Sequence, residues 1–348
     1  MVNVCMVGHG MMGIWHSDAL RRVPDAQLHT VVGRPRDPTK EEQRPGAGRK
    51  PSSTEEFATR YGYKKWTTSF DDAMADPDVD VVIIAGPSET HAEMALKSVQ
   101  AGKHTLVEIP IAMNLADSER VVAAAKDKGV TLGLSHPMRF RSEHADVAAR
   151  VKAGTERLYH THGRFYIYRL HNVGATGLQR TWTDNILWHH STHLVDIGLW
   201  LACGGDMSGA DDRVSNVYGF YPAIEPRTGI PMEIVIHVET RDNQSIIVTG
   251  SYYASWRIYD VLTTTDRDTY LVDELTSTLQ VKEETRPIPS EQENAELIAP
   301  DFVRAVVDGR EPLVPGWSVL PTMRVLHRVQ EDWDAKYGKQ QLPGRPTI

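Results

Sequence analysis

The sequence is poor in cysteine, in long apolar runs and in excess positive charge, and each shortage argues against a class of protein. Its two cysteines, Cys5 and Cys203, have neither a metal-ligand nor a disulfide spacing, which is typical of a reduced, cytoplasmic setting. No apolar run reaches the roughly 18 residues of a membrane span, and the first residues lack the charged and then apolar pattern of a signal peptide. The 46 Asp and Glu outnumber the 38 Lys and Arg, and the net charge of −8 argues against a surface that coats nucleic acid or membranes. We therefore expect a soluble cytoplasmic enzyme or binding protein with no nucleic-acid and no membrane partner.

A glycine motif follows the first predicted strand directly. Residues Val2–Val7 are apolar and rich in β-branched side chains, Gly8-His9-Gly10-Met11-Met12-Gly13 comes next, and residues 14–23 have helical periodicity. A strand, a GxGxxG motif and a helix in this order are typical of dinucleotide binding. The first glycine permits a tight turn, the second a close approach to a pyrophosphate, and the third close packing of helix on strand. We expect Gly8, Gly10, Met11, Met12 and Gly13 to contact the cofactor.

The residues after the second predicted strand favour NADP over NAD. An NAD-selective site places Asp or Glu here, to accept hydrogen bonds from the ribose 2′-hydroxyl. This chain has Arg34, which follows Gly13 by 21 residues, and Arg36. Guanidinium groups suit a 2′-phosphate. Two alternatives stay open: the arginines only solvate a loop, or Asp37 reaches the ribose and NAD is used.

The order of predicted elements indicates two domains in the 348 residues. Strands and helices alternate up to about residue 134, which predicts an α/β domain of Rossmann type with a parallel sheet over residues 1–135. Residues 136–348 are predicted to form an α+β domain for substrate binding and oligomerisation, with a mostly antiparallel open sheet. Its strands are predicted at residues 159–170, 214–221, 233–240, 245–253 and 259–264, and its helices at 184–200, 293–307 and 318–337.

The predicted helix over residues 184–200 contains His189, His193 and Asp196 on similar faces. Three interpretations compete: a histidine that accepts a substrate proton, a metal site, or polar side chains packed in the interior. A nicotinamide site already has its electrophile, so the missing part is a base rather than a metal ion. We therefore favour a catalytic histidine without a metal.

Several segments together resemble the Gfo/Idh/MocA oxidoreductase family. They are Gly8–Gly13, Pro87-Ser88-Glu89-Thr90-His91, and Ala101–His104 leading to Glu108-Ile109-Pro110. The resemblance implies that His193 is the proton acceptor and that His189 stands where the family usually has an aspartate. It also implies cofactor contacts for Pro87, His91, Glu108 and Pro110.

One departure from the family pattern is large. The family's Glu-Lys-Pro segment carries a lysine that assists proton transfer, and here Ile109 takes that place. Residues 107–112, 135–140 and 180–190 resemble a branch of the family that oxidises a cyclic hemiacetal with two carboxylates to 2-pyrone-4,6-dicarboxylate. Such a small dicarboxylate substrate requires cations in an acidic protein. We expect its binding residues to be His136, Arg139, Arg169, Arg180 and Trp182.

Other functions and the assembly state stay open at this point. A sugar or cyclitol dehydrogenase of the same family, a non-catalytic NADP(H)-binding sensor, and a metal-dependent lyase or hydrolase are the alternatives. If Ile234, Ile236 and Val238 point outward from the antiparallel sheet, their apolar face favours a homodimer or homotetramer.

Overall fold

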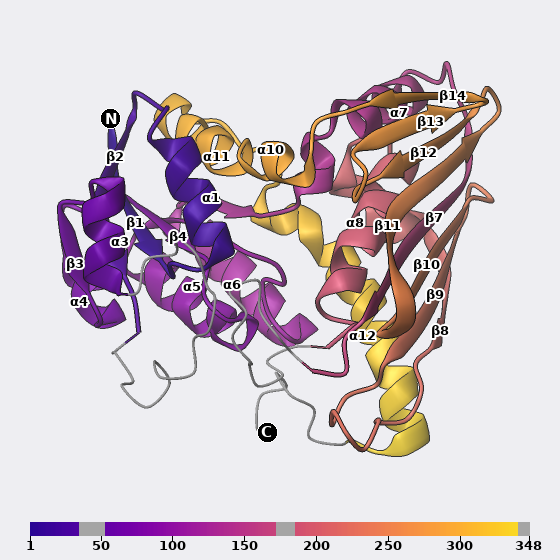
Figure 1. The fold of residues 1–348 in the computed structure, drawn as a ribbon, viewed down its shortest axis with the longest axis horizontal. Helices are drawn as coiled ribbons and strands as arrows, with labels where there is room; N and C mark the ends of the chain where they lie inside the picture. The colour runs from indigo at the N-terminus through magenta and orange to yellow at the C-terminus, as the bar shows by residue number, and fades with distance from the viewer. Residues whose placement is uncertain (35–52, 172–184, 340–348) are drawn as a thin grey trace.

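The computed structural model describes residues 1–34, 53–171 and 185–339, and it contains two sheets with helices between them (Figure 1). The predicted combination of a parallel N-terminal sheet and a mostly antiparallel second sheet is confirmed. None of the described helices has the length and apolar content to cross a bilayer.

The first sheet has six parallel strands in the order β3-β2-β1-β4-β5-β6. The strands are β1 Val2–Val7, β2 Ala26–Val32, β3 Lys65–Thr67, β4 Val81–Ile84, β5 His104–Val107 and β6 Leu132–Leu134. The helices of this part are α1 Met11–Leu20, α3 Thr54–Tyr61, α4 Phe70–Ala75, α5 His91–Gln100 and α6 Leu115–Lys128. Every residue of β4 is buried, as expected for a central parallel strand covered on both faces. The strand order reverses between β1 and β4, and ligands of such sheets bind beyond the carboxyl ends of the strands at this point.

The second sheet has eight strands in the order β14-β13-β12-β11-β7-β10-β9-β8, antiparallel except for the central pair β7 and β10. The strands are β7 Leu158–Tyr168, β8 Val214–Phe220, β9 Glu233–Thr240, β10 Ser245–Ser251, β11 Tyr253–Thr265, β12 Thr269–Asp273, β13 Thr278–Val281 and β14 Glu284–Pro287. The last three strands were not predicted from the sequence pattern.

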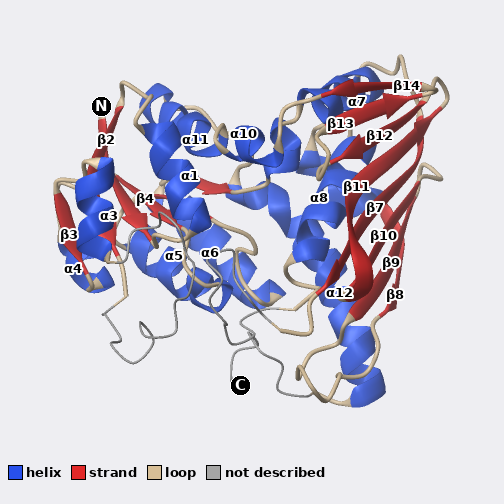
Figure 2. Cartoon of the chain, in the orientation of Figure 1, coloured by secondary structure: helices blue, strands red, loops and turns tan. Residues whose placement is uncertain are grey.

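Helices cover only the face of this second sheet that is turned toward the first one (Figure 2). They include α7 Ser142–Lys152, α8 His190–Ala202 and α12 Leu320–Tyr337, and the short α9 Ala210–Arg213 precedes β8. In the described part of the chain, no helix lies on the opposite face. The helix predicted over residues 184–200 begins later than expected, at His190, because residues 186–189 form turns.

Two late helices, α10 Glu291–Ala295 and α11 Ile298–Asp308, return to the first sheet. Phe302 of α11 packs so closely on β6 that a Cβ atom at Gly133 would lie 2.6 Å from its ring. Residues far along the chain thus belong to the core of the N-terminal half. The predicted division after residue 135 stays a prediction.

Three residues of β9 do not have the outward orientation that was the condition for an oligomer contact through them. Ile234, Ile236 and Val238 are 1%, 0% and 0% exposed, and they face the helices rather than solvent. Alternation along a strand tells which residues share a face, but the helices that pack on one face decide which set is buried.

Candidate active site

The three motif glycines meet different surroundings at the carboxyl end of β1. Gly8 has φ +99°, and a Cβ atom there would lie 2.5 Å from the carbonyl oxygen of Ala85. A Cβ atom at Gly13 would lie 2.3 Å from the carbonyl oxygen of Gly8. A Cβ atom at Gly10, by contrast, would meet no protein atom within 4 Å among the described residues. The fold itself requires the first and third glycines, whereas the second borders open space at the start of α1.

This open space fits a dinucleotide pyrophosphate. Gly10 is the N-cap of α1, and no side chain caps the helix there, so backbone N–H groups are directed at the site. Met11 is exposed and Met12 half-buried at the same helix start. Arg34 is exposed just beyond the end of β2, while Arg36 lies outside the described residues.

His91, which we predicted to contact the cofactor, is buried and connects two loops of the site. Its Nδ1 lies 2.7 Å from the carbonyl oxygen of Pro110, and its Nε2 lies 3.1 Å from that of Gly86. The imidazole therefore ties the loop after β4, which contains Pro87, to the loop after β5. This position makes His91 a positioning residue for both loops.

Glu108 at the end of β5 pairs with a histidine that sequence reasoning missed. His16 of α1 is fully buried, and its Nε2 lies 2.6 Å from Oε1 of Glu108. The pair connects the motif helix to the loop that carries the predicted nicotinamide contacts. A histidine three residues after Gly13, in an otherwise apolar helix start, was the available signal. Ile109, which follows Glu108, is buried.

Imidazoles from two segments meet next to this loop. The rings of His136 and His193 lie 5.5 Å apart, edge to face. Burial lowers the pKa of His136 to about 4, with Asp196 opposing this effect and Arg139 adding to it. Burial, followed by the charges of His136 and His189, holds the pKa of His193 well below its ordinary value. Both rings are therefore neutral near pH 7.

Arg139 does not have the environment predicted for a substrate ligand. Its Nε donates to Oδ2 of Asp196 at 2.7 Å, its Nη2 donates to Oδ1 at 2.6 Å, and Ser318 accepts two further bonds. Both side chains of the pair are 1% exposed. The guanidinium thus neutralises Asp196, which also lies 3.4 Å from Nδ1 of His136. Arg139 is better described as a positioning residue behind the imidazoles.

A second missed histidine, His190, lies at the start of α8. Its ring stacks on Phe165 at 3.6 Å between centroids and lies 4.3 Å from the ring of His189. Its Nδ1 is 2.8 Å from the hydroxyl of Tyr252, and the guanidinium of Arg169 lies 5.6 Å from the centre of that tyrosine ring. The structure thus brings Arg169 and His189 to the same side of the second sheet. The other two predicted substrate ligands, Arg180 and Trp182, lie outside the described residues.

Comparison with known families gives the site its context. Residues 2–136 match the description "Oxidoreductase family, NAD-binding Rossmann fold" of the Gfo/Idh/MocA family, and residues 142–279 match "Bacterial oxidoreductases, C-terminal". The chain belongs to the Gfo/Idh/MocA oxidoreductase family. It is accordingly an oxidoreductase with an NAD(P)-binding fold.

Several Gfo/Idh/MocA relatives have named activities. The 4-carboxy-2-hydroxymuconate-6-semialdehyde dehydrogenase of Sphingobium sp. (strain NBRC 103272 / SYK-6) is 27% identical, and the match covers 94% of this chain and 98% of the relative. The scyllo-inositol 2-dehydrogenase (NAD(+)) of Bacillus subtilis is 32% identical over 44% of this chain and 41% of the relative. Levoglucosan dehydrogenase in complex with NADH and levoglucosan has the same fold, with a TM-score of 0.75 and 18% identity over 96% of this chain and 97% of that one.

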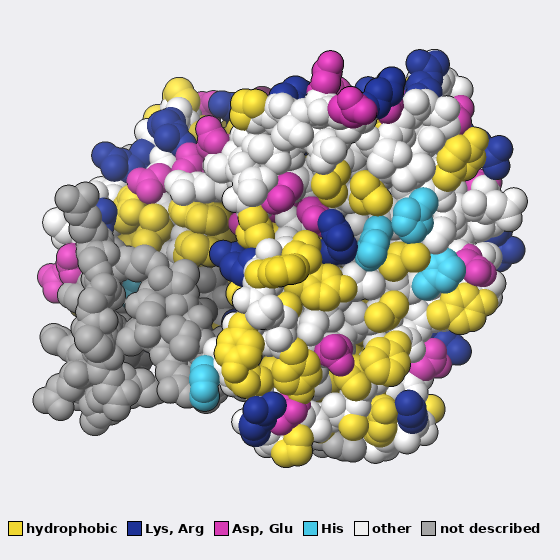
Figure 3. All heavy atoms as spheres, turned by 45° about the vertical axis from the view of Figure 1, so that its right-hand side comes forward, with side chains coloured by type: hydrophobic (Ala, Val, Ile, Leu, Met, Phe, Trp, Pro, Cys, Tyr) yellow, Lys and Arg dark blue, Asp and Glu magenta, His cyan; other side chains and the backbone are white. Residues whose placement is uncertain are grey.

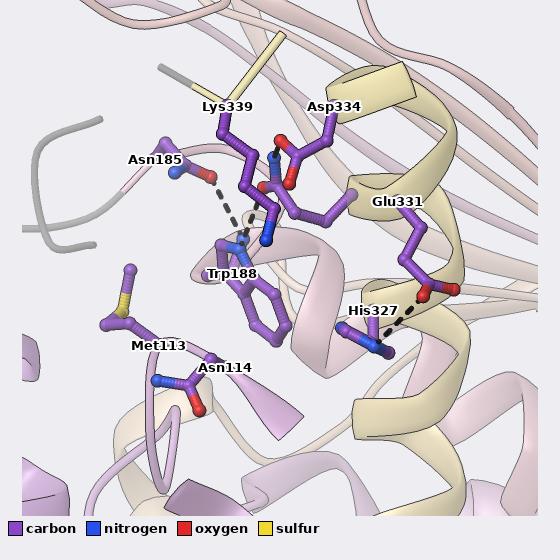
Figure 4. A pocket seen from close by; sticks show the side chains of 9 residues that line it. Met113, Asn114, Asn185, Trp188, His327, Glu331, Asp334 and Lys339 are labelled. Carbon is purple, nitrogen blue, oxygen red and sulfur yellow. Dashed lines mark hydrogen bonds and ion pairs between the residues drawn. The ribbon is translucent and has the colours of Figure 1, made fainter. Parts of the chain in front are cut away.

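Two further observations describe the surroundings of the site in this Gfo/Idh/MocA oxidoreductase. Across residues 1–34, 53–171 and 185–339, no group of three or more His, Cys, Asp or Glu side chains is arranged to hold a metal ion. A cavity of about 330 Å³ lies between the residues before α8 and the second half of α12 (Figure 4). Trp188 donates to Gln330 beside it, and His327 faces Glu331 along α12. None of the predicted site residues that the structure describes lines this cavity.

Proposed function

We propose that the protein is an NADP-dependent dehydrogenase that oxidises the cyclic hemiacetal of 4-carboxy-2-hydroxymuconate-6-semialdehyde to 2-pyrone-4,6-dicarboxylate. The observation that carries the proposal is the pair of neutral imidazoles, His136 and His193, next to a loop where Ile109 replaces the family's lysine. A site without that lysine needs another proton acceptor, and a neutral histidine is suited to the task near pH 7. The match to the Sphingobium dehydrogenase over nearly the whole chain supports the choice of substrate.

The residues of the glycine loop and its neighbours would hold the cofactor. Backbone N–H groups at the start of α1 would bind the pyrophosphate beside Gly10, and Arg34 would bind the 2′-phosphate. Glu108, held by His16, would order the nicotinamide end. When bound, NADP⁺ supplies an acceptor for the hydride that leaves the hemiacetal carbon.

His193 would accept the hydroxyl proton of the hemiacetal. Its Nδ1 is buried without a hydrogen-bond partner among the described residues, so we assign Nε2 to the substrate hydroxyl. The proton moves to Nε2 while the C–H bond breaks as a hydride and a C=O bond forms. Asp196 would stabilise the resulting positive charge, because its carboxylate favours the protonated forms of His136 and His193. Arg139 keeps that carboxylate ionised, and burial holds the pKa of both resting imidazoles low. His189, whose charge acts on His193, would serve as an alternative proton partner.

Hydride transfer followed at 340 nm tests this proposal directly. With the hemiacetal and NADP⁺, His193→Ala should lower turnover by about 100-fold or more, because loss of a general base has an effect of that order. A turnover within about threefold of the wild type would remove His193 from the role. NADP(H) binding without any absorbance change, for acids and polyols alike, would instead identify the non-catalytic sensor.

A cyclitol or sugar dehydrogenase is the second candidate, favoured by the partial match to the inositol dehydrogenase. Neutral polyols are recognised by Asp, Asn and Gln rather than by arginines. Rates measured side by side with scyllo-inositol, glucose and the hemiacetal separate the two candidates. A higher kcat/KM for a polyol than for the hemiacetal would overturn the first proposal.

We infer that the uncovered face of the second sheet forms a homo-oligomer contact. Tyr218, Phe220 and Val235 on neighbouring strands β8 and β9 are 54%, 53% and 40% exposed. Figure 3, with this side of the molecule turned forward, shows hydrophobic side chains gathered there with histidines among them. Exposed apolar groups of this size favour burial against another copy. Phe220→Lys should therefore lower the mass of the assembly in sedimentation measurements, and an unchanged mass would refute this contact.

A further inference from the structure

His190, the first residue of α8, is held in one orientation by two contacts. Its ring stacks on that of Phe165 in β7, with the ring centroids 3.6 Å apart and the planes inclined by 16°. Its Nδ1 lies 2.8 Å from the hydroxyl oxygen of Tyr252. Rotation of the side chain would break both contacts, so the imidazole has a fixed orientation before any ligand binds.

Tyr252 is a rigid partner for this imidazole. It is fully buried and lies in the short link between β10 and β11. Its backbone N–H donates to the carbonyl oxygen of Met232 at 2.8 Å, and its own carbonyl oxygen accepts from the N–H of Arg169 at 2.9 Å. Since both backbone groups are bonded, the position of the hydroxyl beside α8 is set by the sheet.

The direction of the hydrogen bond between Tyr252 and His190 decides which nitrogen of the ring carries the proton. Burial is the largest cause that holds the pKa of His190 well below its ordinary value, so the ring is neutral near pH 7 and one nitrogen donates while the other accepts. A phenolic hydroxyl, with a reference pKa of about 10, is a stronger acid than the N–H of a neutral imidazole, and the bare imidazole nitrogen is the stronger base. The hydroxyl therefore donates to Nδ1, which leaves the proton on Nε2.

The N–H group at Nε2 of His190 is available to a ligand. Among the residues that the structure describes, Nδ1 makes the only hydrogen bond of this ring. The side chain is half-buried, and polar groups in such places are nearly always hydrogen-bonded to protein, water or ligand. A donor that the fold orients and does not use is suited to an acceptor oxygen of a bound molecule.

The place of His190 on α8 brings this donor close to the predicted base. His190 and His193 are three positions apart in the helix, a spacing at which side chains are neighbours with Cβ atoms about 5–6 Å apart. The ring of His190 also lies 4.3 Å from that of His189. A six-membered hemiacetal whose hydroxyl meets His193 is large enough to place a carboxylate at His190.

We propose that Tyr252 fixes the tautomer of His190 and that Nε2–H of His190 donates a hydrogen bond to a carboxylate of the substrate. The inference rests on the proposed function, because it takes the substrate of that reaction as the ligand. The two histidines then have opposite tasks: His193 accepts the proton of the reacting hydroxyl, whereas His190 donates to a group that does not react. His190 is a binding residue, and Tyr252 is a positioning residue that acts through it.

NMR of protein labelled with ¹⁵N in its histidines measures the tautomer directly, because the shift of a ring nitrogen depends on whether it carries a proton. The signals of His190 are those missing from the spectrum of His190→Asn. At pH 7 we expect the proton on Nε2 in the wild type and a mixture of both tautomers in Tyr252→Phe. A proton on Nδ1 in the wild type would overturn the inference.

Calorimetric titration of the NADP⁺-saturated protein with 2-pyrone-4,6-dicarboxylate tests the contact. His190→Asn, whose amide reaches only the position of Nδ1, should weaken binding by about 10- to 100-fold, since a hydrogen bond to a charged group has an effect of this order. His190→Gln, whose amide nitrogen reaches the position of Nε2, should bind within about fivefold of the wild type. The matched control is His162→Asn, which removes an imidazole bonded to the hydroxyl of Thr249 at 2.9 Å on the opposite face of the sheet and should bind as the wild type does.

Two further readouts separate a binding role from a structural one. In the oxidation of the hemiacetal, His190→Asn should raise KM by the same factor as Kd and leave kcat within about threefold. Equal losses of affinity in His190→Asn and His190→Gln would indicate a structural role and overturn the inference, as would no binding to the wild type at 10 mM, roughly 10⁴ times a micromolar affinity. A wild type that binds the dicarboxylate, with the variants in the expected order, but does not oxidise the hemiacetal would contradict the proposed function and leave this inference standing.

Discussion

Replacing Arg139 with methionine tests how the histidine site is supported. The guanidinium makes two bonds to Asp196, at 2.7 and 2.6 Å, and both side chains are 1% exposed. Removing one partner of such a pair leaves a buried, uncompensated charge and costs about 3–5 kcal/mol. Among the residues that the structure describes, Thr322, at 3.2 Å, and His136, at 3.4 Å, are the polar partners that remain near the carboxylate. Since whole domains are stable by about 5–15 kcal/mol, Arg139→Met should lower the free energy of unfolding severely.

The loss should depend on pH with a definite sign. In the wild type, burial raises the pKa of Asp196, but Arg139 and His136 outweigh it, so the folded pKa lies below the ordinary value of 3.8. The stabilisation by the ionised carboxylate is therefore present above about pH 4 and is lost as pH falls through the folded pKa. Without Arg139, burial dominates and the folded pKa rises above the unfolded one. The variant should then be least stable at high pH and recover toward the wild type as pH falls to 5.

Urea unfolding at pH 5 and pH 8 measures both effects. Arg139→Met/Asp196→Asn, which removes the buried charge, should regain at least half of the loss at pH 8, or roughly 2 kcal/mol. The control is Arg310→Met, in an exposed pair with Asp301 where Arg310 is 43% exposed, and it should cost no more than about 1 kcal/mol. A loss below about 1 kcal/mol for Arg139→Met, or no recovery in the double variant, would refute the reasoning.

Three further predictions follow from the same structure. Gly13→Ala should destabilise the fold, because its Cβ atom would lie 2.3 Å from the Gly8 carbonyl oxygen. Gly10→Ala should lower the free energy of unfolding by only about 1 kcal/mol or less, but it should weaken NADP⁺ binding tenfold or more. Equal effects of the two variants on urea unfolding would contradict this. Burial lowers the pKa of His144 to about 3, so its neutral form contributes stability that is lost as pH falls below about 6.5. His144→Leu should therefore remove about 3 kcal/mol of the difference in unfolding free energy between pH 7 and pH 4.5. An unchanged difference in urea midpoints between the two pH values would count against this. Arg34→Gln should raise the Kd for NADP⁺ at least tenfold and that for NAD⁺ by less than about threefold. If a fluorescence titration shows the same increase in Kd for both cofactors, Arg34 does not contact the 2′-phosphate.

The local features of this protein follow from contiguous residues. The strand, glycine motif and helix at residues 2–20 are legible in sequence because each requirement, an apolar run, a tight turn and a helix start, involves neighbours along the chain. The alternation of strands and helices likewise predicts the parallel sheet, and runs of alternating polarity predict most of the second one. The helix that carries His193 and Asp196 is likewise predicted from the sequence, although His189 lies in the turn just before it.

Only the tertiary structure decided what these residues contact. Glu108 pairs with His16 across 92 residues, and Arg139 reaches Asp196 across 57, so no local pattern distinguishes these side chains from cofactor or substrate ligands. Ile234 shares a strand face with its neighbours by alternation, but the helices packed on the second sheet determined that this face is buried. Long-range packing assigns partners to charged groups, because a buried charge must be neutralised wherever in the sequence its counterpart lies.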